Sequence, residues 1–131
     1  MKILVLEDAV FKREQITDFL DEKGVEYEVA EYLNPALKYI FGSKKEISGI
    51  ILDLGLAMAK KLPETYSLHR GLDLIYELDR RKIEISILIN SSTFVGMLDE
   101  YPFVYGQRTK IDNYQILEDF ISFLKQREEQ K

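Results

Sequence analysis

The chain lacks cysteine altogether and has one histidine among its 131 residues. Without cysteine it can form neither disulfides nor a thiolate zinc site, and His69 alone cannot build an imidazole cluster. Proline and glycine are scarce too, at three and seven residues, and a 46% hydrophobic composition is unlike that of a disordered or fibrous chain. We therefore expect a globular protein, and any metal that it binds should have oxygen ligands.

Long hydrophobic runs and dense basic clusters are also missing. The apolar run after Lys2 ends at Glu7, which is too short for a signal peptide, and no later stretch is long enough to span a membrane. The net charge is −5, whereas direct binding to nucleic acid needs a positive face. The sequence therefore predicts a cytoplasmic protein that contacts neither membranes nor nucleic acid directly.

Short apolar runs alternate with amphipathic segments along the whole chain, which is typical of an α/β domain. The predicted strands are Lys2–Leu6, Glu26–Ala30, Gly49–Leu52, Glu84–Ile89 and Pro102–Tyr105. The predicted helices are Val10–Lys23, Pro35–Phe41, Leu72–Arg81 and Tyr114–Glu128, with a weaker one over Ser92–Glu100. Because this length suits one domain, we expect residues 1–131 to form a single domain.

The apolar strands predict how this domain is layered. Near-continuous apolar runs are typical of parallel strands that are covered on both faces. Since crossover connections are right-handed, the chain must wind both ways from an inner first strand. We therefore predict a doubly wound, five-stranded parallel sheet of order 2-1-3-4-5 with helices on both faces. Such sheets bind ligands beyond the carboxyl ends of their strands, where the strand order reverses.

Three acidic residues fall at that point: Glu7 and Asp8 follow the first strand, and Asp53 follows the third. Two carboxylates about 4 Å apart repel by about 4 kcal/mol at an effective dielectric constant of about 20, so the cluster must take up protons or a cation. Mg²⁺ suits a few carboxylates together with water and a phosphate oxygen. Such acids can also cap helices or lie solvated at strand ends, and for Asp8 alone that is the better explanation, but three acids at this edge of the sheet favour a metal site.

Ser91 and Lys110 are predicted at the same edge of the sheet. A hydroxyl can donate to a phosphoryl oxygen, and an ammonium can neutralise its charge. Taken singly, Ser91 is consistent with a helix cap and Lys110 with an exposed loop lysine. Beside the acidic cluster, they indicate a place for a phosphoryl group.

These residues resemble the receiver domain of bacterial two-component response regulators, and the resemblance covers nearly the whole chain. The matching segments are Lys2–Asp8, Ile50–Leu54, Gly71–Ile75, Ile87–Ser92 and Thr109–Lys110. The resemblance implies a stand-alone, CheY-like phosphoacceptor domain that acts through protein–protein interaction. It would be phosphorylated by a histidine kinase or phosphotransfer protein and would pass the signal to a downstream protein partner.

The resemblance also implies roles for individual residues. Asp53 would be the phosphoacceptor, Ser91 the switch hydroxyl and Lys110 the lysine that pairs with the phosphoryl group. The ligands of Mg²⁺ would be Glu7, Asp8, Asp53 and the backbone carbonyl of Gly55. Such a domain is not an enzyme, because at most it catalyses its own phosphorylation and dephosphorylation.

The chain departs from the family pattern in three places. The loop at about 54–70 is extended, with extra residues from Ala57 to His69. Ile111 stands where the family has a proline, and Gln107 stands where it has an aromatic switch residue. Tyr105 could replace that aromatic residue only if the last strand had a different register.

Two further alternatives remain beside the phosphorylated receiver. One is a pseudo-receiver, an interaction module whose acidic site is residual and which ignores phosphorylation. The other is a small Mg²⁺-dependent phosphohydrolase, which the lack of a second acid two residues after a strand-one nucleophile disfavours. The predicted partner surface contains Phe94, Met97, Tyr101 and Phe103, residues that are equally consistent with core packing.

Overall fold

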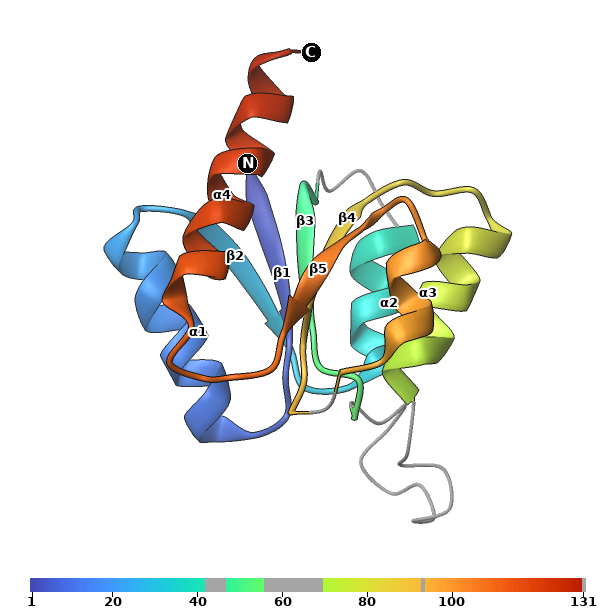
Figure 1. Cartoon of the computed structure of the whole chain (residues 1–131), viewed down its shortest axis with the longest axis horizontal. Helices are drawn as coiled ribbons and strands as arrows, with labels where there is room; N and C mark the ends of the chain where they lie inside the picture. The colour runs from blue at the N-terminus through green and yellow to red at the C-terminus, as the bar shows by residue number, and fades with distance from the viewer. Residues whose placement is uncertain (42–46, 56–69, 93, 131) are drawn as a thin grey trace.

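A computed structural model describes residues 1–41, 47–55, 70–92 and 94–130 of the chain. Its parallel strands form a five-stranded sheet of order β2-β1-β3-β4-β5, as the sequence predicted (Figure 1). The strands are β1 (Lys2–Leu6), β2 (Glu26–Ala30), β3 (Gly49–Leu52), β4 (Ser86–Asn90) and β5 (Val104–Arg108). The doubly wound α/β fold is thereby confirmed.

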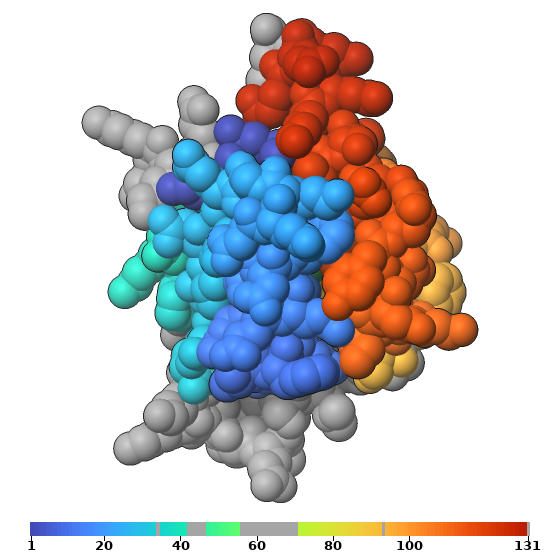
Figure 2. All heavy atoms as spheres, turned by 90° about the vertical axis from the view of Figure 1, so that its left-hand side faces the viewer, coloured from blue at the N-terminus to red at the C-terminus, as the bar shows by residue number. Residues whose placement is uncertain are grey.

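Helices cover both faces of the sheet (Figure 1). On one face lie α1 (Val10–Glu22) and α4 (Tyr114–Glu129), which Figure 2 shows side by side. On the other lie α2 (Leu33–Phe41), α3 (Arg70–Arg80) and the short 3₁₀ helix η2 (Gly96–Glu100). None of the described helices is both long and apolar enough to cross a membrane.

The alternation of side chains along each strand builds two apolar layers. In β1, Ile3 and Val5 pack with α1 and α4, whereas Leu4 and Leu6 pack with α2 and α3. All four side chains are fully buried. A central strand of this sheet is therefore apolar on both sides, which explains the continuous hydrophobic runs in the sequence.

Strands β4 and β5 differ from the predicted segments Glu84–Ile89 and Pro102–Tyr105. The residues from Tyr101 to Phe103 form the turn after η2, so β5 begins two residues later and continues to Arg108. Gly106 disfavours a strand, and neither Gln107 nor Arg108 has the branched or aromatic side chain that predicts one. Pairing with β4 nevertheless extends the strand, with Gly106 opposite Leu88 and Arg108 opposite Asn90.

Helix boundaries differ by smaller amounts. The helix predicted weakly over Ser92–Glu100 is the 3₁₀ helix Gly96–Glu100. Helix α2 begins at Leu33 rather than Pro35, and the proline is tolerated because the first turn of a helix needs no intrahelical N–H donor there. The extra residues 57–69 lie outside the described part of the chain.

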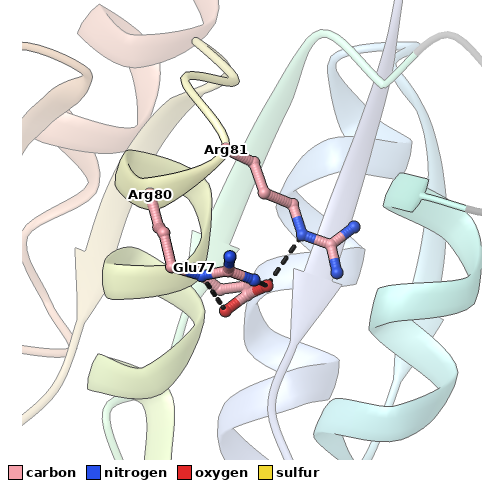
Figure 3. Close-up of polar contacts among 3 residues, drawn as sticks. All are labelled: Glu77, Arg80 and Arg81. Carbon is pink, nitrogen blue, oxygen red and sulfur yellow. Dashed lines mark hydrogen bonds and ion pairs between the residues drawn. The ribbon is translucent and has the colours of Figure 1, made fainter.

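Ion pairs on α3 lie at the side that faces α2 (Figure 3). Glu77 accepts hydrogen bonds from Arg80 and Arg81, and these bonds lower the pKa of the Glu77 carboxyl. The Arg81 guanidinium lies 4.2 Å from the centroid of the Phe41 ring on α2. Exposed ion pairs contribute little to stability, so the buried apolar layer dominates the contact between these helices.

Gly71 brings the start of α3 against the backbone that carries Asp53. Its N–H donates to the Leu54 carbonyl at 2.9 Å. A Cβ at Gly71 would lie 2.6 Å from the Asp53 carbonyl oxygen and 2.6 Å from Leu54 Cα, so the backbone would have to move.

We expect Gly71→Ala to lower the free energy of unfolding by about 1–3 kcal/mol, the usual effect of overpacking, as measured by urea denaturation. Gly96→Ala is the matched control, because its Cβ would meet only Phe94 Cε1 at 3.6 Å. Equal stability of the two variants would contradict this close packing.

Candidate functional site

Three carboxylates meet at the carboxyl ends of β1 and β3. The parallel register pairs Leu6 with Leu52, so Glu7, Asp8 and Asp53 follow the two strands at the same edge of the sheet. One oxygen from each carboxylate lies within 4.8 Å of the others. Glu7 is buried, Asp53 half-buried and Asp8 exposed. The structure thus brings together the three acids that the sequence indicated.

Glu7 is the most unusual member of this cluster, because its side chain is only 1% exposed. The Ala9 N–H donates to Oε2 at 3.4 Å, but Oε1 has no hydrogen-bond partner among the described residues. Burial and then the nearby charge of Asp53 raise the pKa of Glu7 to about 8, against smaller opposing effects of the Ala9 hydrogen bond and of Lys12. The buried oxygen requires either a proton or a cation.

The donor set fits a small hard cation. Carboxylate oxygens are ligands that Mg²⁺ prefers, and the exposed Asp8 leaves room for the waters that the ion retains. The fourth residue of the expected ligand set, Gly55, lies next to Asp53, since its N–H donates to Asp53 Oδ1 at 3.2 Å. This hydrogen bond also orients the Asp53 carboxylate.

Ser91 and Lys110 line one small pocket of about 40 Å³ at the ends of β4 and β5. The Ser91 N–H donates to the Arg108 carbonyl at 3.1 Å, which extends the pairing of the two strands. The pocket is lined by Lys12, Asn90, Ser91, Ser92, Arg108, Thr109, Lys110 and Ile111. Hydroxyl and cationic groups therefore surround one small pocket at this edge of the sheet.

Gln107 holds the segment between β4 and η2. Its side-chain oxygen accepts from the Val95 N–H at 2.9 Å, and its side-chain nitrogen donates to the Val95 carbonyl at 2.7 Å and to Asp99 at 3.2 Å. Tyr105 instead packs on α4, with its ring 5.2 Å from that of Phe120. An irregularity in the pairing with β4 separates the two residues, so Tyr105 does not take the place of Gln107.

The predicted partner surface divides into two parts. Phe94 and Met97 are 59% and 75% exposed. Tyr101 and Phe103 are half-buried against the core, with ring centroids 5.6 Å apart. Core packing therefore accounts for the second pair, and the first pair forms an exposed apolar patch.

Arg108 was not among the predicted site residues, although its buried side chain lines the pocket of Ser91 and Lys110. The omission arose because the last strand was ended at Tyr105, which left Arg108 in a loop. The useful signal was its place directly before Thr109 and Lys110, at the end where strands carry functional residues.

Comparisons with known proteins identify the fold. No protein-family model matches the chain, and no curated protein matches it at a significant level. Among solved structures, the response regulator TrrA from Thermotoga maritima in complex with Mg²⁺-BeF is 23% identical, with a TM-score of 0.69 over 94% of this chain and 97% of that one. TrrA in complex with the histidine kinase ThkA matches with 23% identity and a TM-score of 0.68, over 94% and 97%.

A third neighbour is a CheY-like response regulator receiver domain protein from Methanospirillum hungatei. It is 16% identical, with a TM-score of 0.74 over 99% of this chain and 98% of that one. At these identities the similarity establishes the fold, which is that of response-regulator receiver domains.

The raised pKa of Glu7 makes both stability and metal binding depend on pH. Unfolding returns the pKa of Glu7 from about 8 to 4.5, so between these values the folded protein retains a proton that the unfolded chain releases. The contribution of Glu7 to the stability of the metal-free protein therefore falls as pH rises through this range. Mg²⁺ needs the ionised carboxylate and competes with the same proton.

Because the pKa of Glu7 is about 8, we expect Mg²⁺ affinity to rise about tenfold to a hundredfold between about pH 6 and about pH 8, with proton release, as measured by calorimetry. Glu7→Gln should weaken binding and remove most of this pH dependence. Glu14→Gln, which changes an exposed glutamate on α1, is the control. An affinity that does not change with pH in the unaltered protein would contradict the assignment.

The contacts of Gln107 predict a local effect on hydrogen exchange. Because the Val95 N–H donates to Gln107, Gln107→Ala should speed exchange of that amide about fivefold, the factor that corresponds to about 1 kcal/mol. Gln126→Ala on the exposed side of α4 is the matched control. Unchanged exchange at Val95 would mean that Gln107 does not hold this segment in solution.

Proposed function

We propose that the chain is a single receiver-like domain, residues 1–131, that is phosphorylated on Asp53 with the help of Mg²⁺ and signals through protein–protein interaction. The observation that carries this proposal is the cluster of Glu7, Asp8 and Asp53, in which the buried Glu7 Oε1 has no hydrogen-bond partner in the part of the chain that the structure describes. The receiver fold supports it, as does a structural neighbour that was solved with Mg²⁺-BeF.

Asp53 is better suited to act as the nucleophile than Glu7 or Asp8. Glu7 is buried and has a pKa of about 8, so it is largely protonated at neutral pH without a metal. Asp8 is exposed, and the structure gives it no hydrogen bond that would orient it among the described residues. Asp53 is half-buried, and the Gly55 N–H fixes one of its oxygens.

The reaction is a phosphoryl transfer to a carboxylate. An Asp53 oxygen attacks the phosphorus of the donor, and the bond from phosphorus to the leaving group breaks. The leaving group, an imidazole nitrogen or a carboxylate oxygen, departs with the electron pair. The Ser91 hydroxyl donates to one phosphoryl oxygen and Lys110 neutralises another, while bound Mg²⁺ supplies further positive charge.

Exposed apolar residues near the site favour a protein, and not a small molecule, as the phosphodonor. Val10 and Phe11 begin α1 close to the acidic cluster, and Ile111 is exposed beside Lys110. A neighbour of this fold was solved in complex with a histidine kinase. We infer that a histidine kinase or phosphotransfer protein in the cytoplasm docks here, and that Phe94 and Met97 contact a downstream partner.

A phosphorylation-independent pseudo-receiver is the second candidate function. Gln107 stands at the position where receiver domains have an aromatic switch residue. Its three hydrogen bonds favour the pseudo-receiver, because they hold the segment that precedes η2 in place. In that case, the exposed patch of Phe94 and Met97 would have one constant shape. Mg²⁺ would then bind weakly, and phosphodonors would have no effect.

The two candidates differ in one chemical test. We expect purified protein incubated with acetyl phosphate and Mg²⁺ to gain one phosphoryl group by intact mass. Asp53→Asn or removal of the metal should abolish the adduct, and Asp79→Asn, an exposed aspartate on α3, should leave it unchanged. No adduct on the unaltered protein, together with weak Mg²⁺ binding, would favour the pseudo-receiver.

A further inference from the structure

Arg108 carries a buried charge at the end of β5. Its side chain is 1% exposed, and no carboxylate forms an ion pair with it among the residues that the structure describes. Burial lowers the pKa of the guanidinium, although not enough to remove its charge. Burying a charge costs several kcal/mol unless hydrogen bonds offset the loss of water. The acceptors around Arg108 therefore have to compensate.

The Arg108 guanidinium donates hydrogen bonds to three parts of the chain. Nε donates to the Asn113 carbonyl at 3.0 Å, and Nη2 donates to the Ile111 carbonyl. Nη1 donates to Asn90 Oδ1 at 2.9 Å, at the end of β4. Nη2 also reaches Gln15 Oε1 on α1 at 3.5 Å. The rigid fork thus joins α1, the end of β4 and the loop between β5 and α4.

That loop carries Lys110. The carbonyls of Ile111 and Asn113, which follow Lys110 in this loop, accept hydrogen bonds from the Arg108 guanidinium. The Asn113 N–H donates back to the Lys110 carbonyl at 3.1 Å, which closes a turn around it. No proline stiffens this loop, so its course is held by the Arg108 hydrogen bonds together with this turn.

The same residue also holds Ser91. Its carbonyl accepts from the Ser91 N–H at 3.1 Å, and its guanidinium binds the side chain of Asn90, the preceding residue. Main chain and side chain of Arg108 therefore link Ser91 to the loop that carries Lys110. These two residues line the same pocket, and Arg108 forms part of its wall.

We propose that Arg108 is a positioning residue that fixes Lys110 relative to Ser91, so that both groups are in place when a phosphoryl group reaches Asp53. This inference rests on the proposed function. A lysine on an unrestrained loop would have to be ordered during the reaction, and that entropy loss slows the transfer. Lysine cannot replace Arg108, because its single ammonium lacks the planar fork that binds separate carbonyls.

The first test compares phosphorylation rates. Arg108→Met keeps the length and apolar stem of the side chain, and Arg108→Lys keeps the charge but loses the fork. With acetyl phosphate and saturating Mg²⁺, we expect both to take up phosphate about tenfold to a hundredfold more slowly, the usual effect of misplacing a reacting group. Mg²⁺ affinity should stay unchanged, because Glu7, Asp8 and Asp53 follow β1 and β3 and not β5.

Arg127→Met is the matched control. Arg127 also donates from its guanidinium to a side chain of β4, Ser86, at 2.5 Å, but at the opposite end of that strand. We expect this variant to be phosphorylated at the wild-type rate. An equal slowing in Arg127→Met and Arg108→Met would show a general loss of stability and would overturn the positioning role.

A double-mutant cycle separates positioning from mere structural support. If Arg108 acts through Lys110, then Arg108→Met combined with Lys110→Ala should be no slower than Lys110→Ala alone. Fully additive losses would overturn the proposal. If Arg108→Met fails to fold by circular dichroism, Arg108→Lys, which retains the buried charge, carries the same cycle.

The outcomes keep the two proposals apart. If the unaltered protein takes up no phosphate, the proposed function fails and Arg108 has no phosphoryl group to serve. If the unaltered protein is phosphorylated and both folded Arg108 variants match its rate, only the positioning role of Arg108 fails.

Discussion

The repulsion between Glu7 and Asp53 is the interaction on which the rest of the site depends. Parallel pairing of Leu6 with Leu52 fixes both acids at one edge of the sheet, and the apolar layers on either side leave the strands no freedom to separate. Burial is the largest cause of the raised pKa of Glu7, and the repulsion adds an electrostatic cost to it. Either protonation or a divalent cation relieves it, and only the cation also suits a phosphoryl group.

The sequence was sufficient to predict the fold and the acidic cluster because both follow from local patterns. Apolar runs such as Ile50–Leu52 mark strands that are covered on both faces, and parallel strands bring the residues after them to one edge. The predicted extent of β5 was wrong because Gly106 and Gln107 have no strand preference of their own. They are part of the strand only because they pair with β4. The contacts of Arg108 with Asn90 and Gln15 are tertiary, and no local pattern contains them.

Strand β5 supports the site from both of its faces. On one face, Gln107 holds the segment before η2 through the main chain of Val95. On the other, Arg108 holds the loop before α4 and the end of β4. The acids follow β1 and β3, whereas these polar contacts come from β5, so metal binding and the placement of Lys110 are separable properties of one sheet edge.

The irregular pairing near the start of β5 has a consequence for sequence alignment. Regular alternation would direct Tyr105 and Gln107 to the same side of the sheet, yet one packs on α4 and the other on the segment before η2. An alignment with a regular strand that leaves no gap here assigns one of these residues to the wrong layer. Homologous positions in this strand therefore have to be matched by the face that they occupy, and not by counting from a shared motif.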